Sequence, residues 1–544
     1  MLALHLSSLK ARNTTPIPII TTTSSSILLQ ISEMARNFVP DAYGWITSLP
    51  PFSQWRTSTM SLCICATPSP SSLSPPPSMS LSVTKTPPAQ PSHLTFSISA
   101  NYREPISLWT SKPVHLQTKT QQQSLDEQDT VQLFVDVVNQ VLRYGPDSNS
   151  SSTKLPFRFP GVQHLHGSFG DAFNIVFLSL AFLVCTYEAP RDLRRGCLDS
   201  LRAQLTGPRC RGAAKTLVWM LGANLEDQWM RTMNLAVTNW IVELRSSNSR
   251  HMPGVLFSYA VQASGLWKVQ LYCPVIAMGM EDPAAAATQD ERLLFSLNYQ
   301  QLEGVVQLAY RTVRRENWVD VEVKVDNIRC DVESLVSETL MAERGYGSEE
   351  KHFPSRVMLQ ITPMQQTDIL SVSVSKSSDN PTHEFGLEKG IEAAFDAPSS
   401  FGLKASVAES LTLAMKPWKF EQSAHGNTAT LNWFLHDGAN GGREVFSSKP
   451  SKLSLLQPRA WFRDRYSSAY RPFTKQGGVV FARDEYGDSV SWKVCAAALG
   501  KTMDWDVRGW IWLTYWPNKQ RTSHSETRWV EFRECLQLPL AKFP

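Results

Sequence analysis

The sequence predicts a mixed α+β protein: an antiparallel β-sandwich-rich C-terminal half, preceded by a small helical domain and a disordered N-terminus. Three observations predict it. The first 92 residues are rich in proline and serine, residues 125–246 repeat apolar side chains at helical spacing, and the chain after residue 254 alternates like strands. With 544 residues, more than one domain is expected, because single cores stop growing at about 250 to 300 residues.

Residues 1–92 are expected to form a disordered, basic segment. Residues 1–124 carry eight Lys or Arg and three Asp or Glu, a net +5, so the rest of the chain sums to about −1 because the total is +4. Residues 1–33 are hydroxyl-rich and have no acid before Glu33, which is typical of an organelle transit peptide. The alternative is that translation begins at Met34. We therefore expect an intracellular protein, in the chloroplast with a start at Met1 and in the cytoplasm with a start at Met34.

A proline-rich stretch follows at residues 67–91, TPSPSSLSPPPSMSLSVTKTPPAQP, with eight prolines. Proline removes backbone donors and fixes φ, so this stretch predicts an exposed linker. Residues 93–124 are expected to be an extended segment. It opens with HLTFSISANY, whose alternation predicts a strand that joins a sheet made mainly by later sequence.

Residues 125–246 are expected to form the helical domain. Between Val131 and Leu142, apolar side chains recur at intervals of three and four residues, which predicts an amphipathic helix. Residues 172–187, AFNIVFLSLAFLVCTY, are apolar all round but fall short of the roughly 20 residues that cross a bilayer. A buried core helix is therefore preferred to a membrane span. A third helix is expected over APRDLRRGCLDSLRAQL (residues 189–205). A fourth has Asn224 as its N-cap, and its Trp and Met stripe is expected in the core.

Nothing in the sequence indicates a cofactor or a metal. GPRCRGAAKT does not match the phosphate-binding P-loop motif. That motif needs a lysine directly after its second glycine, and here Ala213 and Ala214 separate Gly212 from Lys215. The nine cysteines contain no CxxC pair, which argues against structural zinc and favours reduced thiols. The nearly neutral charge of the chain after residue 124 argues against specific nucleic-acid binding, which needs clustered Lys and Arg.

The C-terminal half is expected to hold a β-rich domain over residues 254–380 and a Trp-rich β domain over residues 381–544. Short strand-like runs follow one another, with RLLFSLNYQ (residues 292–300) among them, and turns rather than helices separate them. In WVDVEVKVDNI the valines alternate with charged residues, so one face is core and the other is wet. Antiparallel pairing into one or two sandwiches is the expected result.

Three stretches carry a resemblance to a known family: VDNIRCDVESLV, FSSKPSKLSLLQPRAWFRDRYSSAYRPFTKQGGVVFARDEYG and GWIWLTYWPNK. They resemble an uncharacterised land-plant protein family with no assigned activity, over most of the chain from about Met34. The resemblance implies a plant source and transfers no chemistry.

Catalytic motifs are absent from the sequence. There is no GxSxG elbow, no HExxH and no GxGxxG after a strand. Carboxylates lie near C-terminal tryptophans, as a glycoside hydrolase requires, but they are better explained as turn caps and solvated strand positions. The sequence therefore favours a protein without catalytic activity.

A possible ligand-binding surface combines aromatic and charged residues of the last domain. GWIWLTYW has apolar residues on both faces, which predicts a strand covered on both sides, and its expected partner TRWVEFRECLQL has one half-open side. The predicted loop RDRYSSAYR contributes three arginines, whose guanidinium groups can each bind a phosphate or carboxylate through two hydrogen bonds. The candidate residues are Trp510, Trp512, Trp516, Trp529, Arg463, Arg465 and Arg471.

These observations lead to one preferred function and two alternatives. The preferred one is a plant-specific, non-enzymatic binding or scaffold protein whose β-sandwich interacts with a protein or a lipid surface. One alternative is a carbohydrate-binding or carbohydrate-active protein that uses the C-terminal Trp side chains. The other is a peripheral membrane protein of the plastid. The sequence does not set the oligomeric state.

Overall fold

The computed structural model describes most of the chain after residue 39, and the described residues belong to one compact unit, Pro40–Pro544. The described ranges are 40–50, 54–66, 77–85, 93–102, 104–115, 127–146, 157, 159, 168–245, 257–281, 290–347, 350–374, 383–388, 410–415, 418–437, 443–444, 479–481, 489–515, 522 and 524–541.

An antiparallel sheet forms near the N-terminus in the order β1-β2-β3-β4, and β5 also pairs with β3. Its strands are β1 (Thr59–Ala66), β2 (Ser78–Lys85), β3 (His93–Asn101), β4 (Ile106–Thr110) and β5 (Val114–His115). Strands β1 to β4 pair in sequence order and β5 pairs back with β3, so the sheet contains no strand from the C-terminal half.

This sheet corrects two expectations. Strands β1 and β2 lie inside the range 1–92, which was expected to be disordered, and β3 joins this local sheet rather than one made by later sequence. The reason lies between the proline runs, where SMSLSVTK is free of proline and alternates Met79, Leu81 and Val83, all buried. Proline content averaged over the whole stretch hid this alternation. The rest of the proline-rich stretch, residues 67–76 and 86–91, lies outside the described residues.

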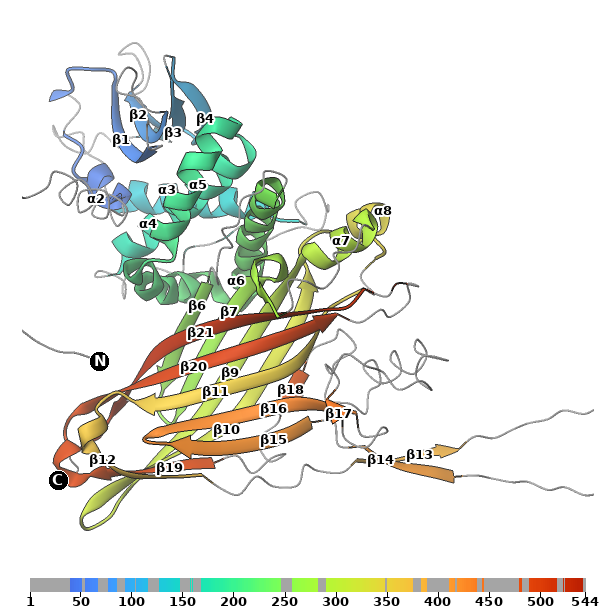
Figure 1. The fold of residues 1–544 in the computed structure, drawn as a ribbon. Coiled ribbons are helices and arrows are strands. Elements are labelled where there is room, and N and C mark those ends of the chain that lie inside the picture. The colour runs from blue at the N-terminus through green and yellow to red at the C-terminus, as the bar shows by residue number, and fades with distance from the viewer. Residues whose placement is uncertain are drawn as a thin grey trace, which may run out of the picture. The chain divides into compact units, whose positions relative to one another are not determined.

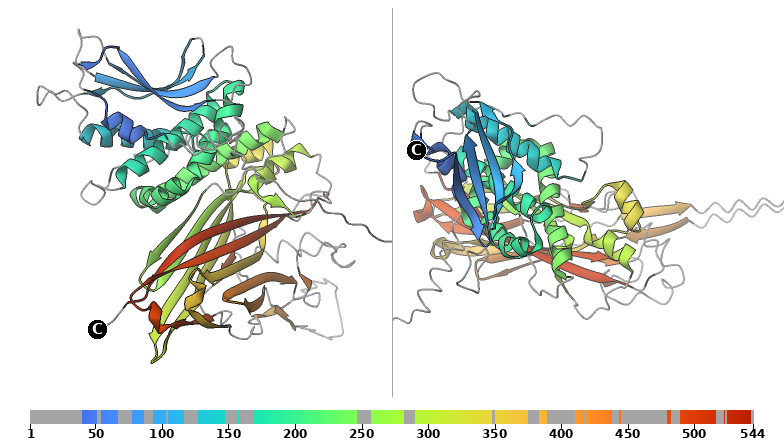
Figure 2. Two further views of the ribbon diagram at one scale, coloured as in Figure 1. Left: turned by 60° about the vertical axis from the view of Figure 1, so that its left-hand side comes forward. Right: turned by 90° about the horizontal axis from the view of Figure 1, so that it is seen from above.

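Five helices form a layer that contacts both sheet regions. They are α2 (Ala42–Thr47), α3 (Glu127–Arg143), α4 (Phe169–Tyr187), α5 (Arg191–Leu205) and α6 (Pro208–Arg245). Helix α5 contacts β1 and β2, whereas α6 contacts β6 and β7 of the C-terminal half (Figure 2). Helices α3 to α6 fall within the range 125–246, where the sequence predicts helices. Helix α6 is bent at Gly222, whose φ of 69° is not helical.

Helix α4 is the centre of this layer. It contacts α2, α3, α5 and α6, and its side chains are buried on all sides. Among the described residues, α4 has the length and composition to cross a membrane, and 83% of its 18-residue apolar window is buried inside the fold. The apolar residues 172–187 thus pack inside the fold in this structure.

The C-terminal half contains two large antiparallel sheets (Figure 1). The first sandwich sheet has the order β12-β19-β10-β9-β7-β6, with β18 also paired to β10. Its strands are β6 (Phe257–Ala263), β7 (Leu266–Pro274), β9 (Gln300–Arg314), β10 (Trp318–Ser334), β12 (Ile369–Val374), β18 (Val479–Phe481) and β19 (Ser489–Cys495).

The second sandwich sheet has the order β15-β16-β11-β20-β21-β8, with β17 also paired to β16. Its strands are β8 (Gly279–Met280), β11 (Phe353–Pro363), β15 (Trp418–His425), β16 (Thr428–Asp437), β17 (Arg443–Glu444), β20 (Thr502–Tyr515) and β21 (Glu526–Pro539). A separate two-stranded sheet pairs β13 (His383–Glu388) with β14 (Ser410–Met415).

The expected division at residue 380 does not separate two sheets. In the first sandwich sheet, β19 lies between β12 and β10, and in the second, β11 lies between β16 and β20. Both sheets therefore contain strands from residues 254–380 and from residues 381–544. The alternation of apolar and polar residues predicts which segments are strands. It does not predict which strands pair, because pairing joins segments that are far apart in the chain.

One predicted strand is a helix. RLLFSLNYQ falls mainly in α7 (Glu291–Asn298), which packs against α8 (Glu338–Arg344). The Asp290 carboxylate caps α7: it accepts hydrogen bonds from the backbone N–H groups of Arg292 and Leu293, at 3.0 and 3.2 Å. Leu293 and Leu297 are one helical turn apart and both buried. A cap before leucines at i and i+4 favours a helix over the alternation of a strand.

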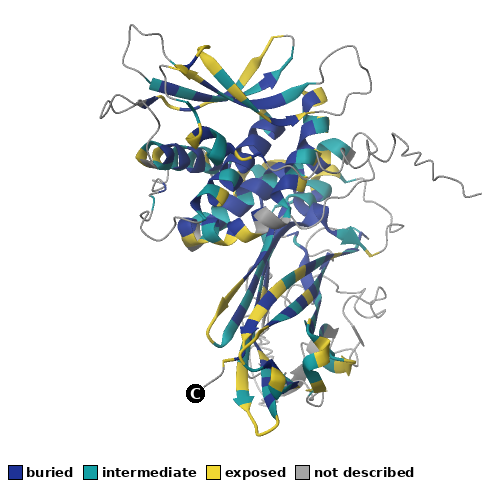
Figure 3. Cartoon of the chain, turned by 90° about the vertical axis from the view of Figure 1, so that its left-hand side faces the viewer, coloured by how far each residue is buried: buried dark blue, intermediate teal, exposed yellow. Residues whose placement is uncertain are grey.

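The sandwich core is built on three tryptophans. The ring of Trp505 on β20 lies 5.7 Å from that of Trp267 on β7 and 4.8 Å from that of Trp492 on β19. All three are fully buried, so they join the inner faces of the two sheets. The alternation of buried and more exposed positions along the strands is visible in Figure 3. In β10 it matches the sequence, which placed the valines of WVDVEVKV in the core.

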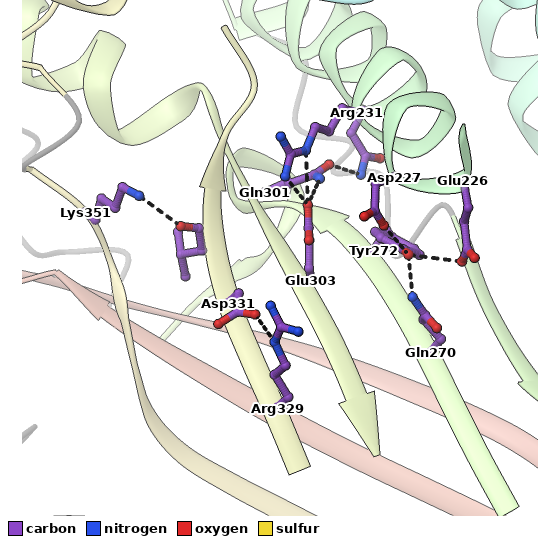
Figure 4. Close-up of polar contacts among 12 residues, drawn as sticks. Glu226, Asp227, Arg231, Gln270, Tyr272, Gln301, Glu303, Arg329, Asp331 and Lys351 are labelled. Carbon is purple, nitrogen blue, oxygen red and sulfur yellow. Dashed lines mark hydrogen bonds and ion pairs between the residues drawn. The ribbon is translucent and has the colours of Figure 1, made fainter. Parts of the chain in front are cut away.

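Helix α6 is attached to the sandwich by buried and partly buried polar contacts (Figure 4). The Arg231 guanidinium lies 3.2 Å from the Glu303 carboxylate on β9. The Tyr272 hydroxyl on β7 lies 3.0 Å from Glu226 and 3.1 Å from Asp227 on α6. Burial raises the pKa of Glu226, although hydrogen bonds from the Tyr259 and Tyr272 hydroxyls lower it. Each buried group thus has a partner on the other element, which fixes the second half of α6 to the sheet.

We predict that Trp505→Ala lowers the free energy of unfolding by about 3 to 5 kcal/mol, because it leaves a cavity between the sheets. Trp510→Ala on the same strand is the control and costs less than half as much, because Trp510 is only partly buried. Urea denaturation of the two variants measures both effects. Equal losses would contradict the assignment of Trp505 to the core.

Candidate functional site

The outer face of the second sandwich sheet carries the exposed tryptophans. On β20 every second side chain is buried in the core, and the positions between them face the other way. The buried positions include Trp505, Val507, Ile511 and Leu513. Trp510 and Trp512 have the opposite parity and are partly exposed, so the strand is not covered equally on both sides. The prediction from GWIWLTYW of a strand buried on both faces is therefore wrong, because the face with Trp510 and Trp512 is partly exposed to solvent.

An aromatic row crosses four strands on this outer face. Arg356 on β11 is opposite Phe434 on β16 and Trp512 on β20, and Trp512 is opposite Trp529 on β21. We call Phe434, Arg356, Trp512 and Trp529 the aromatic row. Directly opposed side chains in an antiparallel sheet are close enough to contact each other. Residues from three distant parts of the sequence therefore form one surface.

Two arginines lie over the indole rings. The Arg356 guanidinium is 4.3 Å from the ring centroid of Trp512 and 4.6 Å from that of Phe434. The Arg508 guanidinium is 5.0 Å from the ring centroid of Trp510. These are cation–π distances, so a guanidinium covers one face of Trp510 and one face of Trp512.

Trp529 is in close contact with a glycine. Gly279 on β8 is opposite Trp529 on β21, and a Cβ atom at Gly279 would lie 2.9 Å from the Cε2 and Nε1 atoms of the indole. Only a residue without a side chain allows this approach. Trp529 is 37% exposed, the largest exposed fraction among the described tryptophans of this sheet.

A buried network supports the start of β21 behind Trp529. The Arg528 Nε donates to Glu526 Oε1 at 2.6 Å, and His352 Nε2 lies 2.9 Å from the same oxygen. His524 Nε2 lies 3.5 Å from Glu526 Oε2. Burial by itself raises the pKa of Glu526, but the hydrogen bond from His352, the nearby His524 ring and the charge of Arg528 outweigh it and hold the pKa far below the usual range.

Charges of both signs lie around the aromatic row. The Arg508 Nε contacts the Glu531 carboxylate, and the Arg533 Nε lies 2.7 Å from Asp506. All four side chains project from the outer face of β20 and β21, and the ion pairs are at least partly exposed. The face therefore has no single sign of charge. Among the described residues, no group of three or more His, Cys, Asp or Glu side chains is arranged to hold a metal ion.

The structure brings together three of the predicted site residues: Trp510, Trp512 and Trp529. The other predicted residues, Trp516, Arg463, Arg465 and Arg471, lie outside the described residues.

Sequence reasoning missed Arg356, Phe434 and Gly279, which complete the surface. The alternation in SRVMLQITP places Arg356 on the wet face of a strand, but no local signal shows that this strand lies beside GWIWLTYW.

Comparisons with known proteins add no identification. No protein-family model and no curated protein matches the chain. Among solved structures, Clostridium perfringens delta-toxin is 10% identical with a TM-score of 0.19, covering 51% of this chain and 94% of that chain. The membrane-inserted form of the Clostridium perfringens NetB toxin is 8% identical with a TM-score of 0.17, covering 52% and 92%. A pore forming protein is 10% identical with a TM-score of 0.17, covering 52% and 94%. Similarities this low do not establish a shared fold or function.

We predict that Gly279→Ala displaces the Trp529 ring, because the added Cβ overlaps the indole. With 5-fluorotryptophan incorporated, the fluorine NMR resonance assigned through Trp529→Phe should shift. Gly212→Ala is the control, because a Cβ atom there meets nothing within 4 Å. An unchanged Trp529 resonance in Gly279→Ala would contradict the close contact between Trp529 and Gly279.

We predict that Glu526→Gln lowers the free energy of unfolding at neutral pH by about 3 to 5 kcal/mol, because it leaves the buried Arg528 without its counter-charge. The pKa of Glu526 is lower in the folded than in the unfolded chain. Its contribution is therefore complete above the unfolded pKa and is lost as the pH falls through the acid range.

Urea denaturation at neutral and acidic pH measures this contribution. The loss caused by Glu526→Gln should shrink on acidification. Glu531→Gln is the control on the same strand, and because its ion pair is exposed it should cost less than about 1 kcal/mol. A pH-independent loss in Glu526→Gln would contradict the ionised network.

Proposed function

We propose that this chain is a non-enzymatic binding or scaffold protein that uses the outer face of the second sandwich sheet to hold a partner protein. One observation carries the proposal: Trp510, Trp512 and Trp529 face outward together with Arg356 and Arg508. Tryptophan and arginine are the residue types that contribute most to binding at protein interfaces. They are held on a sheet, so little ordering is needed when a partner binds.

The charges on this face favour a protein over a lipid surface. Arg508 pairs with Glu531, which is directly opposite Trp510, and Arg533 pairs with Asp506, so these two bases each have an acid beside them. An anionic bilayer attracts only the bases, and burial of either sign among acyl chains is costly. At the rim of a protein interface, charge pairs of this kind remain hydrated.

A carbohydrate ligand is the second candidate, and the position of Trp529 favours it. Its indole is in close contact with Gly279 and is 37% exposed, and an exposed indole is a platform for a sugar ring. Trp510 and Trp512 are less suited to this role, because an arginine lies over one face of each ring. We therefore rank a protein partner above a glycan.

An intracellular location and a plant source belong to the same proposal. All nine cysteines lie in described parts of the chain and each is a free thiol, which supports a reducing compartment. The plant source is supported by the sequence resemblance alone.

The test places a photo-crosslinking amino acid at Arg533, an exposed position at the rim of this face. We expect a specific protein adduct that Trp529→Ala weakens by roughly thirtyfold in affinity, because truncation of an interface tryptophan costs about 2 kcal/mol. The matched control is the same amino acid at Leu370, which is 57% exposed on β12 of the other sheet.

The result separates the candidates. The same adduct from Leu370, or an adduct that Trp529→Ala leaves unchanged, would overturn the proposal. Glycan-array binding that Trp529→Ala abolishes would favour the carbohydrate ligand instead.

A further inference from the structure

A second exposed surface lies on the first half of α6, before the bend at Gly222. Trp219 is 59% exposed, more than any other large apolar side chain among the described residues. Lys215, one turn earlier, is also exposed, whereas Leu217 and Leu221 are buried on the opposite side of the helix. This half of α6 is therefore anchored by its leucines and presents a lysine and a tryptophan outward.

The surroundings of this helix face are open. A Cβ atom built at Gly212 or at Gly222 meets no atom of the described residues within 4 Å. Gly212, Lys215, Trp219 and Gly222 follow one another at intervals of three and four residues, so they lie along one side of the helix. We call these four residues the α6 stripe.

The charge of this segment has one sign. Between Pro208 and Leu225 the sequence contains three Lys or Arg and no Asp or Glu. On the outer sheet face, by contrast, acids and bases alternate. Asp171 on α4 lies near Cys210 at the start of this half of α6, but the charged residue among Gly212, Lys215, Trp219 and Gly222 is a lysine, and its positive charge is complementary to an anionic partner.

We propose that the α6 stripe docks on an anionic lipid surface. The indole of a tryptophan prefers the boundary between headgroups and acyl chains, where its apolar body and its N–H are both accommodated. A lysine one turn away keeps its ammonium group at the headgroup phosphates while its stem stays on apolar surface. Helix α4 remains buried in this arrangement, so the contact is peripheral and does not span the bilayer.

This contact is weak and reversible. One tryptophan and a few basic residues provide less apolar area than a complete amphipathic helix, so the attraction depends strongly on charge. Binding is therefore lost as salt screens the lysine and arginine charges. It is independent of the outer sheet face, because the two surfaces share no residue.

The test is co-sedimentation of the full-length chain with phosphatidylcholine vesicles, with and without phosphatidylglycerol. We expect binding at low salt only when phosphatidylglycerol is present. Lys215→Glu changes the charge by two units and should weaken binding by roughly thirtyfold. Trp219→Ser should weaken it by roughly tenfold, because it removes one interfacial aromatic side chain. Both positions are exposed, so both variants should unfold at the same denaturant concentration as the parent chain.

Leu370→Ser is the matched control, an exposed apolar side chain on the first sandwich sheet outside both surfaces, and should bind vesicles like the parent chain. The proposal is overturned if anionic vesicles do not bind, or if Lys215→Glu and Trp219→Ser bind them unchanged. It is also overturned if duplex DNA binds more tightly than the vesicles and that binding depends on Lys215 but not on Trp219, because the stripe then recognises charge alone.

Discussion

The contact of Trp505 with Trp267 and Trp492 sets the orientation of every side chain on β20. Side chains of a strand alternate between two faces, so once Trp505 is inside, Trp510 and Trp512 must be outside. A register shift of one residue would bury the outer tryptophans and expose the core. The proposed binding face therefore exists because the core of the sandwich is where it is.

Helix α6 is divided by a second constraint. Its later half is fixed to the sandwich because Glu226, Arg231 and Asp227 have partners on β7 and β9. Buried charges without partners are costly, so this half has little freedom to move away. The earlier half, before Gly222, contacts the helical layer through its apolar side and leaves the α6 stripe open. One helix thus joins the two parts of the fold and also presents a surface of its own.

Local patterns predicted the elements that depend on local physics. The helices of residues 125–246 and the alternating valines of β10 follow from apolar spacing alone. The errors occurred where a local signal was weak or diluted. The cap at Asp290 outweighed the apparent strand in RLLFSLNYQ, and the prolines on either side of SMSLSVTK concealed strand β2. The boundary at residue 380 failed because strand order is not a local property.

The sequence by itself determined that Trp510 and Trp512 share one face of a strand and that Trp529 lies beside charged residues, because side-chain alternation is a property of any strand. Only the tertiary structure decided that this face is the outer one and that Arg356, Phe434 and Gly279 complete it. In the sequence these three residues are far from the tryptophans of β20 and β21. Hydrogen-bond register between strands places them side by side, and register depends on which segments share a core.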